Sequence, residues 1–300
     1  GVISYLQSET VSPDVLFFPE QASGRATTFT IAQSAVGKGH PQANGTDNPF
    51  DWRPYRKYIK AKTRKTPFDM YEAPSVVAEG ELTYGENGLF GKGELRYYTA
   101  KHNSEKEGYE FFRRSFISNN QDFRVKTALT DEQWAFQMLS STAEVDFDTQ
   151  EGVFDKLDPY SALEFPSNQY MAYMDHAEWK MDKATVDVKH NQDDEAYLVS
   201  THPLQDSLDF TAGYARFALE PSLLEAFDVE EIEVADSRVL PDSGYVVIRK
   251  NASMDPLENS TIEAKRWTKL HTFYDATARI RGKFNYNAVG TYDYLDEEGS

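Results

Sequence analysis

Alternation of apolar and polar residues is the dominant pattern along this chain. It is clearest at residues 81–84 and 89–98, on either side of a Gly-Glu-Asn-Gly turn, and at residues 245–249 and 277–286. A period of two residues is typical of strands with one buried face, and the β-branched and aromatic residues in these stretches favour strands as well. The pattern therefore predicts an all-β protein built from antiparallel sheets.

Helical signals are few. A Thr-Asp-Glu-Gln capping box begins at Thr130 and precedes an apolar stretch that ends at Phe136, and Ser-Leu-Leu-Glu begins at Ser222. Each pattern is typical of a helix N-terminus. Neither extends past about two or three turns of 3.6 residues, so we expect one or two short helices.

A weak internal repeat links two parts of the chain at an offset of 94 residues. An aromatic pair is followed, at +12 from its first member, by another phenylalanine, and an Asp-aromatic step comes later. The matched residues are Phe17, Phe18 and Phe29 with Phe111, Phe112 and Phe123, and Asp51-Trp52 with Asp146-Phe147. The shared order predicts a duplication. We expect the two triplets to occupy equivalent places, with one residue of each aromatic pair buried.

Three segments follow from this repeat. We predict an incomplete first β-repeat at residues 1–72, a second β-repeat at 73–190 and a third β-rich segment at 191–300, truncated at its C-terminal end. No flexible linker composition separates them. The favoured architecture is an elongated, jelly-roll-like or solenoid-like stack of antiparallel β-sheet repeats. A start on Gly1 and an end on Gly299-Ser300 indicate a fragment of a longer protein.

Composition narrows the classes of partner. The 300 residues include 49 acids against 31 bases, which gives a formal charge of −18. This charge disfavours nucleic acid and anionic membrane surfaces as partners. Cysteine is absent, which excludes disulfides, thiolate metal sites and cysteine nucleophiles. No stretch approaches the roughly 18–20 apolar residues of a membrane span, so we expect no membrane-spanning segment here.

Patterns of known catalytic or metal sites are missing from the sequence. The six histidines show no HExxH spacing, and there is no GxSxG elbow or phosphate-binding loop. Asp146 and Asp148 alternate on one strand face. Carboxylate pairs serve glycoside hydrolysis when they face each other across about 5–10 Å, but a solvated strand edge is the favoured interpretation. His176 and Glu178 are two residues apart and are expected to share a strand face. We predict no catalytic residue, no metal and no cofactor.

A basic segment stands out in this acidic chain. Residues 53–65 carry seven bases and no acid: Arg53, Arg56, Lys57, Lys60, Lys62, Arg64 and Lys65. One hypothesis is a binding site for an anionic lipid or an acidic glycan. The favoured hypothesis is an internal complement, in which the repeat offset brings the acids of residues 144–158 alongside as cross-strand partners.

Aromatic residues offer a second candidate surface. Tyr97 and Tyr98 are adjacent, so on a strand they face opposite ways and one of them is expected to be exposed. Tyr98 and Trp179 are the candidates for stacking on a sugar. Packing in the core or at a sheet edge is the favoured alternative for both.

Two resemblances accompany these residues. Residues 78–84 and 88–95 resemble the repeat of the OstA family, the periplasmic β-jelly-roll proteins of lipopolysaccharide transport, and residues 235–252 are similar. The chain also looks like segments of very large exported proteins of Gram-negative bacteria, in which a GLxGxG step (88–93) and a YxxxMDxxxWxMD step (170–182) recur. These resemblances imply an exported, extended β-structure, and they supply no catalytic residues.

The function expected from these patterns is non-enzymatic. We expect a structural or binding segment of a large exported bacterial envelope protein, located in the periplasm, at the outer membrane or on the cell surface. Its partners would be neighbouring repeats of the same chain and a glycan or lipid. The alternative is a carbohydrate-binding or adhesive surface module, and a carboxylate-dependent glycosidase is a third hypothesis.

Overall fold

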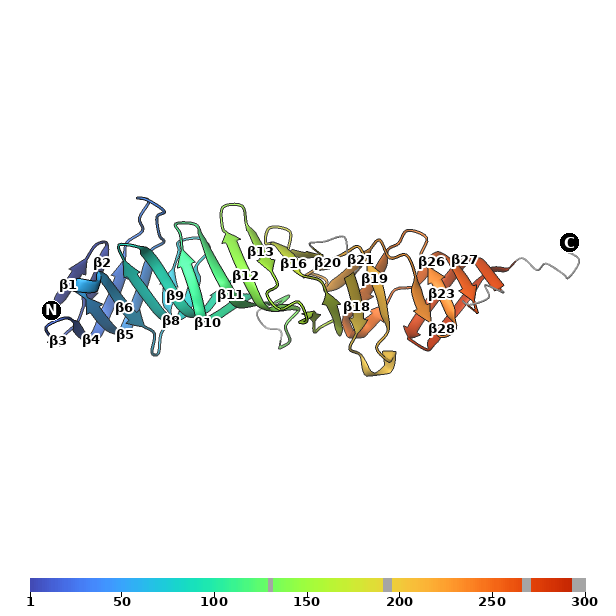
Figure 1. Ribbon diagram of the computed structural model, residues 1–300, viewed down its shortest axis with the longest axis horizontal. Helices are drawn as coiled ribbons and strands as arrows, with labels where there is room; N and C mark the ends of the chain where they lie inside the picture. Colours follow the sequence, from blue (N-terminus) through green and yellow to red (C-terminus); the bar gives the residue numbers. More distant parts are fainter. Residues whose placement is uncertain (129–131, 191–195, 266–270, 293–300) are drawn as a thin grey trace, which may run out of the picture. The chain divides into compact units, whose positions relative to one another are not determined.

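The computed structural model describes residues 1–128, 132–190, 196–265 and 271–292, and it is built from β-strands that pair antiparallel. The all-β prediction is confirmed (Figure 1). In the described part of the chain, helical structure is confined to three single turns, η1 (Pro54–Arg56), η2 (Pro203–Gln205) and η3 (Lys250–Ala252). The chain forms two compact units, one of residues 1–125 and 139–158, the other of residues 126–138 and 159–300.

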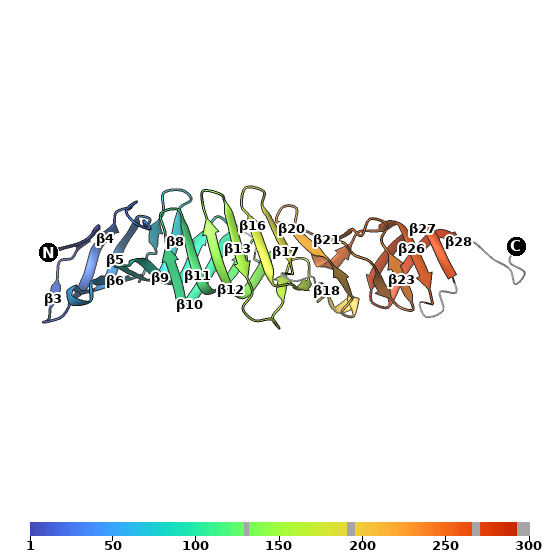
Figure 2. The same cartoon turned by 45° about the horizontal axis from the view of Figure 1, so that its top comes forward.

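The first unit contains the strands from the N-terminus to residue 155. They are β1 (Val2–Tyr5), β2 (Ser8–Val11), β3 (Val15–Phe17), β4 (Ala22–Ile31), β5 (Ala43–Arg53), β6 (Tyr58–Lys62), β7 (Phe68–Met70), β8 (Val76–Gly85), β9 (Gly88–Tyr97), β10 (Ala100–Phe111), β11 (Ser115–Val125), most of β12 (Phe136–Asp146) and β13 (Glu151–Asp155). From β8 to β11 the strands lie side by side in chain order (Figures 1 and 2).

Long strands in the first unit pair with two short strands at one edge. β4 pairs with β5 along its length, while β2 and β3 cover the two halves of its other edge. β8 is built the same way, with β6 and β7 on one side and β9 on the other. Alternate residues of each long strand point inward, which produces the two-residue burial pattern that the sequence predicted.

Paired glycines shape the β8–β9 hairpin, which carries the Gly-Leu-x-Gly-x-Gly step. Gly80 pairs with Gly93, and both have positive φ angles, +134° and +113°. A Cβ on either residue would overlap the backbone carbonyl of the opposite strand, so these positions require glycine. Gly91 leaves room for the Phe111 ring, whose Cε2 would lie 2.7 Å from a Cβ at position 91. The motif of the sequence resemblance is therefore used here for close strand packing.

Aromatic rings fill the interior of the first unit. Phe29 and Phe68 meet edge to face at 6.0 Å between centroids, and Phe123 and Phe154 stack at 4.2 Å. All four side chains are fully buried. Such rings contribute through buried area and through the geometry of the pairs.

The second unit contains the remaining strands, β14 (Leu163–Phe165), β15 (Tyr170–Tyr173), β16 (His176–Lys180), β17 (Thr185–Lys189), β18 (Ala196–Ser200), β19 (Asp209–Ala212), β20 (Tyr214–Ala218), β21 (Leu223–Phe227), β22 (Ile232–Val234), β23 (Ser237–Leu240), β24 (Val246–Arg249), β25 (Ser253–Met254), β26 (Leu257–Ala264), β27 (His271–Gly282) and β28 (Asn285–Tyr292). Of these, β22, β23, β26, β27 and β28 form a separate five-stranded sheet.

A buried amide ties loops of the second unit together. Asn168 is fully buried, and its Nδ2 donates to the carbonyl of Ser222 at 3.1 Å and to that of Ile248 at 2.9 Å. Satisfying both donors removes the cost of burying an amide. This contact fixes the loop between β14 and β15 against β21 and β24.

Both helix predictions need correction. The segment that begins at Ser222 forms the strand β21, in which Leu224 and Ala226 are buried and Glu225 faces outward. Pairing with β20 and β24 outweighs the local capping pattern. The capping residue Thr130 lies outside the described residues, and Phe136, the last residue of the apolar stretch after the capping box, begins the strand β12 instead of continuing a helix.

The matched phenylalanines occupy equivalent backbone positions, as expected from the repeat, but one side-chain expectation is wrong. Phe17 and Phe111 end β3 and β10 at equivalent turns, and Phe29 and Phe123 are both fully buried. Phe111 is 1% exposed, but Phe17 is 73% exposed and Phe18 is 51% exposed. Both members of the first aromatic pair are therefore exposed, because among the described strands only β4 pairs with β3.

The predicted three-segment division stays a prediction. Its first boundary, between residues 72 and 73, falls in the loop that joins β7 and β8, two strands that pair with each other. Its second boundary, after residue 190, adjoins residues 191–195, which lie outside the described part of the chain.

Candidate functional site

The basic segment lies along β6 and its flanking turns in the first unit, and four of its seven bases pair with neighbouring acids. Lys60 and Lys62 project from β6 and reach the two carboxylate oxygens of Glu81 on β8, with Nζ–O distances of 2.8 and 3.1 Å. Lys57 pairs with Glu86 at 2.9 Å. Because β6 pairs directly with β8, these partners face each other across adjacent strands.

Electrostatics on this edge follows the contacts. Burial raises the pKa of Glu81, but the hydrogen bonds from Lys60 and Lys62 outweigh burial, so the pKa is lowered overall. The hydrogen bond to Glu86 raises the pKa of Lys57. Within the protein, the ammonium groups of Lys57, Lys60 and Lys62 therefore already have carboxylate partners.

The expected acidic partners at residues 144–158 are wrong, although the internal complement itself exists. Asp148 pairs with Arg114 at 2.9 Å rather than with the basic segment. Arg53 pairs with Asp51 of its own strand at 2.9 Å. The reason is topology: the strands beside β6 are β5 and β8, so the nearest acids come from those two strands and from the turn after β8.

The remaining bases of the segment are exposed. Arg56 lies in η1, and Arg64 and Lys65 lie in the turn between β6 and β7. Arg64 and Lys65 are close enough to Asp47 to lower its pKa, after the larger effect of its hydrogen bond from Arg25. The structure therefore brings the seven predicted bases onto neighbouring elements, interleaved with acids.

The two aromatic candidates have opposite environments. Tyr98 is 54% exposed while Tyr97 is 3% exposed, so one of the two is exposed as predicted, but Tyr98 lies in the turn after β9 rather than on the strand. Trp179 is 2% exposed, so it cannot stack on a sugar from solvent. Its flanking residues Glu178 and Lys180 point outward on β16, which fixes the tryptophan on the inner face. The sugar-stacking hypothesis for Trp179 is therefore wrong.

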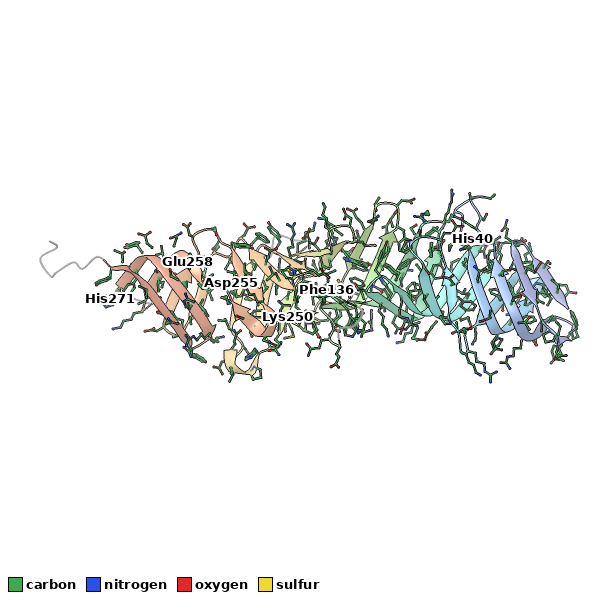
Figure 3. The ribbon with its side chains drawn as sticks, turned by 180° about the vertical axis from the view of Figure 1, so that it is seen from behind. His40, Phe136, Lys250, Asp255, Glu258 and His271 are labelled. Carbon is green, nitrogen blue, oxygen red and sulfur yellow. The ribbon has the colours of Figure 1, made fainter. Side chains whose placement is uncertain are left out.

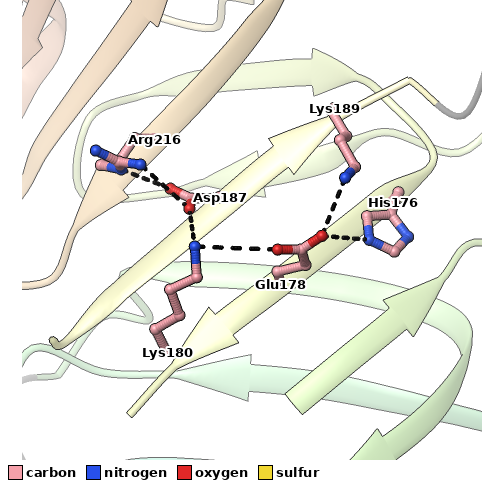
Figure 4. A network of polar contacts seen from close by, with 6 residues as sticks. All are labelled: His176, Glu178, Lys180, Asp187, Lys189 and Arg216. Carbon is pink, nitrogen blue, oxygen red and sulfur yellow. Dashed lines mark hydrogen bonds and ion pairs between the residues drawn. The ribbon is translucent and has the colours of Figure 1, made fainter. Parts of the chain in front are cut away.

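A charged network covers the outer face of β16, β17 and β20 (Figure 4). Lys180 lies 2.7 Å from Asp187 and 4.0 Å from Glu178, and Asp187 also accepts from Arg216 at 2.6 Å. Burial raises the pKa of Asp187, but Arg216 and Lys180 lower it more. Lys180 thus bridges two carboxylates, Glu178 and Asp187, that lie opposite each other in the β16–β17 register.

His176 and Glu178 share a strand face, as predicted, with Nε2 and Oε1 3.2 Å apart. Lys189 approaches the same carboxylate oxygen at 3.0 Å and is the main cause of the lowered pKa of Glu178. This carboxylate is held in its charged form by three neighbours. Its arrangement suits a surface ion-pair network.

The carboxylate pair of the glycosidase hypothesis serves a turn. The Oδ1 atom of Asp146 accepts from the backbone N–H groups of Asp148 and Thr149 at 2.7 and 3.1 Å. This is the local side-chain-to-backbone bonding that aspartate makes at turns. Asp148 is bound to Arg114, so the two carboxylates have separate structural partners.

An open hollow lies in the first unit, beside His40 (labelled in Figure 3). Its volume is about 370 Å³, within the range of small-molecule sites. Three loops line it: the β1–β2 turn, the loop between β4 and β5, and the turn between β8 and β9. The polar and apolar lining residues include Gln7, His40 and Tyr84 with Leu6 and Val36.

Three side chains form a hydrogen-bonded group in this hollow. Nε2 of His40 lies 3.1 Å from the Tyr84 hydroxyl and 3.4 Å from Oε1 of Gln7, and the hydroxyl donates to Gln7. Nδ1 of His40 lies 3.1 Å from the carbonyl of Pro41. Burial raises the pKa of Tyr84, which keeps its hydroxyl neutral.

The wall of the hollow combines charge balance with exposed apolar side chains. Lys38 and Glu86 both line it, but each is paired elsewhere, with Glu110 and Lys57 respectively. Leu6 is 55% exposed and Val36 is 84% exposed. A neutral, hydroxyl-bearing ligand fits such a wall better than a strongly charged one.

Sequence reasoning missed this hollow. Gln7, His40 and Tyr84 lie on three separate hairpins, 33 and 44 residues apart, and no motif spacing joins them. The only local signal was the glycine-rich stretch 37–40, where Gly37 and Gly39 both have positive φ angles. Such glycines mark a tight loop, but they do not say what the loop faces.

A second histidine–tyrosine pair is sealed inside the first unit. Nε2 of His102 lies 2.8 Å from the Tyr97 hydroxyl, and Nδ1 lies 2.8 Å from Oε1 of Gln121. Gln121 in turn donates to Ser141 at 3.0 Å. Burial lowers the pKa of His102 to about 3, so the ring is neutral and its role is to satisfy a buried polar group.

Comparison with protein-family models, with curated proteins and with solved structures finds no match for the chain. Over the residues that the structure describes, no helix has the length and apolar character needed to cross a membrane. Within the same residues, no three acidic or histidine side chains gather in a group that could hold a metal ion.

Proposed function

We propose that this chain is a non-enzymatic structural and binding segment of a large exported bacterial envelope protein, with neighbouring repeats as partners. The observation that carries the proposal is that side chains on both faces of the sheets are packed or paired within the protein. Inner faces are packed with aromatic rings, and outer faces carry cross-strand ion pairs such as those in Figure 4. Side chains satisfied in this way suit a scaffold.

The proposed location in the cell envelope is based on the sequence resemblance, and it can be tested in cells. Antibodies raised against the chain should detect the full-length protein in the envelope fraction, and external protease should reach it after outer-membrane permeabilisation. A cytoplasmic protein should serve as the control for cell integrity. Recovery of the protein with that control in the cytoplasmic fraction would refute the proposal.

The scaffold role of the basic segment has its own test. Neutralising Lys60, Lys62, Arg64 and Lys65 together should lower thermal stability slightly at low salt and hardly at high salt, because surface ion pairs are screened. Binding to lipopolysaccharide or acidic glycans should be weak in both proteins. Strong binding by the wild type that disappears in the variant, with stability unchanged, would make this edge a ligand site.

Carbohydrate binding is the second candidate function, and the hollow beside His40 favours it. Its neutral hydrogen-bonding groups and exposed apolar walls suit a sugar ring, which presents hydroxyls at its edge and C–H groups on its faces. Gln7→Ala should abolish binding to a neutral glycan panel, because it removes one of the hydrogen-bonding groups of the hollow. Gln7 is exposed, so the substitution should leave the fold intact. Asn119→Ala, an exposed amide on β11, is the matched control. Unchanged glycan binding in Gln7→Ala would exclude this hollow.

A further inference from the structure

Two hairpins of the first unit have the same backbone pattern. Phe17 pairs with Ala22 across the β3–β4 turn, and Phe111 pairs with Phe116 across the β10–β11 turn. In both turns the N–H of the next residue, Phe18 or Phe112, donates across the loop at 2.8 Å. The two loops therefore have the same length and the same closing hydrogen bond.

The match continues along the strands. Thr10 pairs with Phe29 on the first hairpin, as His102 pairs with Phe123 on the second. Together β2 and β3 thus correspond to the two halves of β10. The second hairpin can therefore show what covers the outer edge of the first.

On the second hairpin, a complete strand covers that edge. β9 pairs with β10 from Tyr97↔Ala100 to Leu89↔Phe111. Leu89 is fully buried, and Gly91 makes room for the Phe111 ring. The cover over Phe111 is therefore an antiparallel strand with an apolar–x–glycine pattern.

On the first hairpin, only half of that cover is present. β1 corresponds to the second half of β9: Tyr5 pairs with Ser8 as Tyr97 pairs with Ala100, and Ile3 pairs with Thr10 as Leu95 pairs with His102. Gly1 then corresponds to Gly93. In the described part of the chain, no strand corresponds to the first half, residues 88–92, which would lie on β3.

The uncovered edge is apolar as well as unpaired. Leu16 and Phe17 of β3 and Phe18 beyond it are 62%, 73% and 51% exposed. Exposed strand edges with apolar side chains are templates for pairing with another strand. Phe17 occupies the position at which Phe111 is buried under Leu89 and Gly91.

We propose that the free edge of β3 binds an antiparallel β-strand of a neighbouring repeat, with the apolar–x–glycine chemistry of Leu89–Phe90–Gly91. The mode is β-strand addition, in which backbone hydrogen bonds supply affinity and alternate side chains supply specificity. The inference rests on the proposed structural role and names the surface through which repeats would join. Its occupant is argued from the strand that covers the equivalent edge of β10.

The test supplies the missing half-strand. Grafting the sequence of residues 88–92, Gly-Leu-Phe-Gly-Lys, directly before Gly1 extends β1 to the full pattern of β9. Hydrogen exchange of the amides at residues 15–17 should slow by at least about tenfold, since a tethered strand pairs at high effective concentration. A control graft with lysine in place of its leucine should give no protection.

Substitutions in the grafted chain locate the contact. Phe17→Asp should remove the protection, while Phe284→Asp should leave it unchanged. Phe284 is the matched control because it is 70% exposed and lies in the second unit. Protection that survives Phe17→Asp, or no protection by the leucine-bearing graft, would overturn the proposal.

A final measurement separates the possible occupants. Sedimentation of the ungrafted chain should show no association that depends on Phe17. Self-association that Phe17→Asp abolishes would assign the edge to a second copy and overturn the neighbouring-repeat assignment. Neither result changes the location and salt-dependence tests of the scaffold role, so the two proposals can fail separately.

Discussion

The hairpins β3–β4 and β10–β11 share their register, yet the aromatic residues at their turns differ in burial. Phe29 and Phe123 are both fully buried, and so are their partners Thr10 and His102. The aromatic residues at the turns differ, because β9 covers the β10 edge and no described strand covers the β3 edge. The comparison teaches that strand register depends on the hairpin itself, whereas burial depends on the next strand.

The largest expected effect sharpens what the hairpins share. Phe123→Ala and Phe29→Ala should each lower the free energy of unfolding of the first unit by about 3–5 kcal/mol, the usual cost of truncating a buried phenylalanine. Urea unfolding, monitored through hydrogen exchange of amides in that unit, measures the change in the free energy of unfolding for both variants. A cost below about 1 kcal/mol for either variant would mean that its core is not packed as described.

The next effect separates the hairpins. Phe111→Ala should cost about 3–5 kcal/mol, whereas Phe17→Ala should change the free energy of unfolding by no more than about 0.5 kcal/mol, because its side chain is mostly exposed. The same unfolding measurement applies to both. Equal costs would contradict the difference in cover between β3 and β10.

A smaller effect, about 2 kcal/mol between pH 6.5 and 5, appears at the pair Thr10 and His102, since only His102 titrates. Its pKa is about 3 in the folded state, below the value of about 6.5 expected when unfolded. The unfolded chain therefore takes up the proton first, and the stability contributed by neutral His102 is intact above pH 6.5 and lost between pH 6.5 and 3. Stability should fall by about 1.4 kcal/mol per pH unit in that window from this group.

The variant His102→Gln isolates this contribution. Carboxylates titrate in both proteins, so the difference between the two pH profiles belongs to the histidine. The variant should show a shallower fall in the free energy of unfolding between pH 6.5 and 5. Parallel profiles would mean that the ring is not held neutral in the folded state.

The smallest effect concerns the ion pairs outside the hairpins. Glu81→Gln removes the shared partner of Lys60 and Lys62 and should cost no more than about 1 kcal/mol at low salt. The cost should shrink toward zero in about 1 M salt, where charges are screened beyond a few ångströms. A large cost that does not depend on salt would show that Glu81 acts through packing instead.

The sequence by itself determined the strand class and the direction of many side chains. Alternation predicted the β8–β9 hairpin, the buried face of Tyr97 and the shared face of His176 and Glu178. The same rule, applied to Glu178-Trp179-Lys180, would have placed Trp179 inside. These features depend only on the two-residue period of a strand, which is local.

Tertiary structure alone decided which strands became neighbours, and most of the candidate chemistry depended on that. It gave Lys60 the carboxylate of Glu81, turned the segment after Ser222 into a strand, and gathered Gln7, His40 and Tyr84 around one hollow. Each outcome joins residues far apart in sequence, through pairings that compete in energy with local preferences. A local pattern gives the face of a strand, but only the assembled sheet gives what lies beside it.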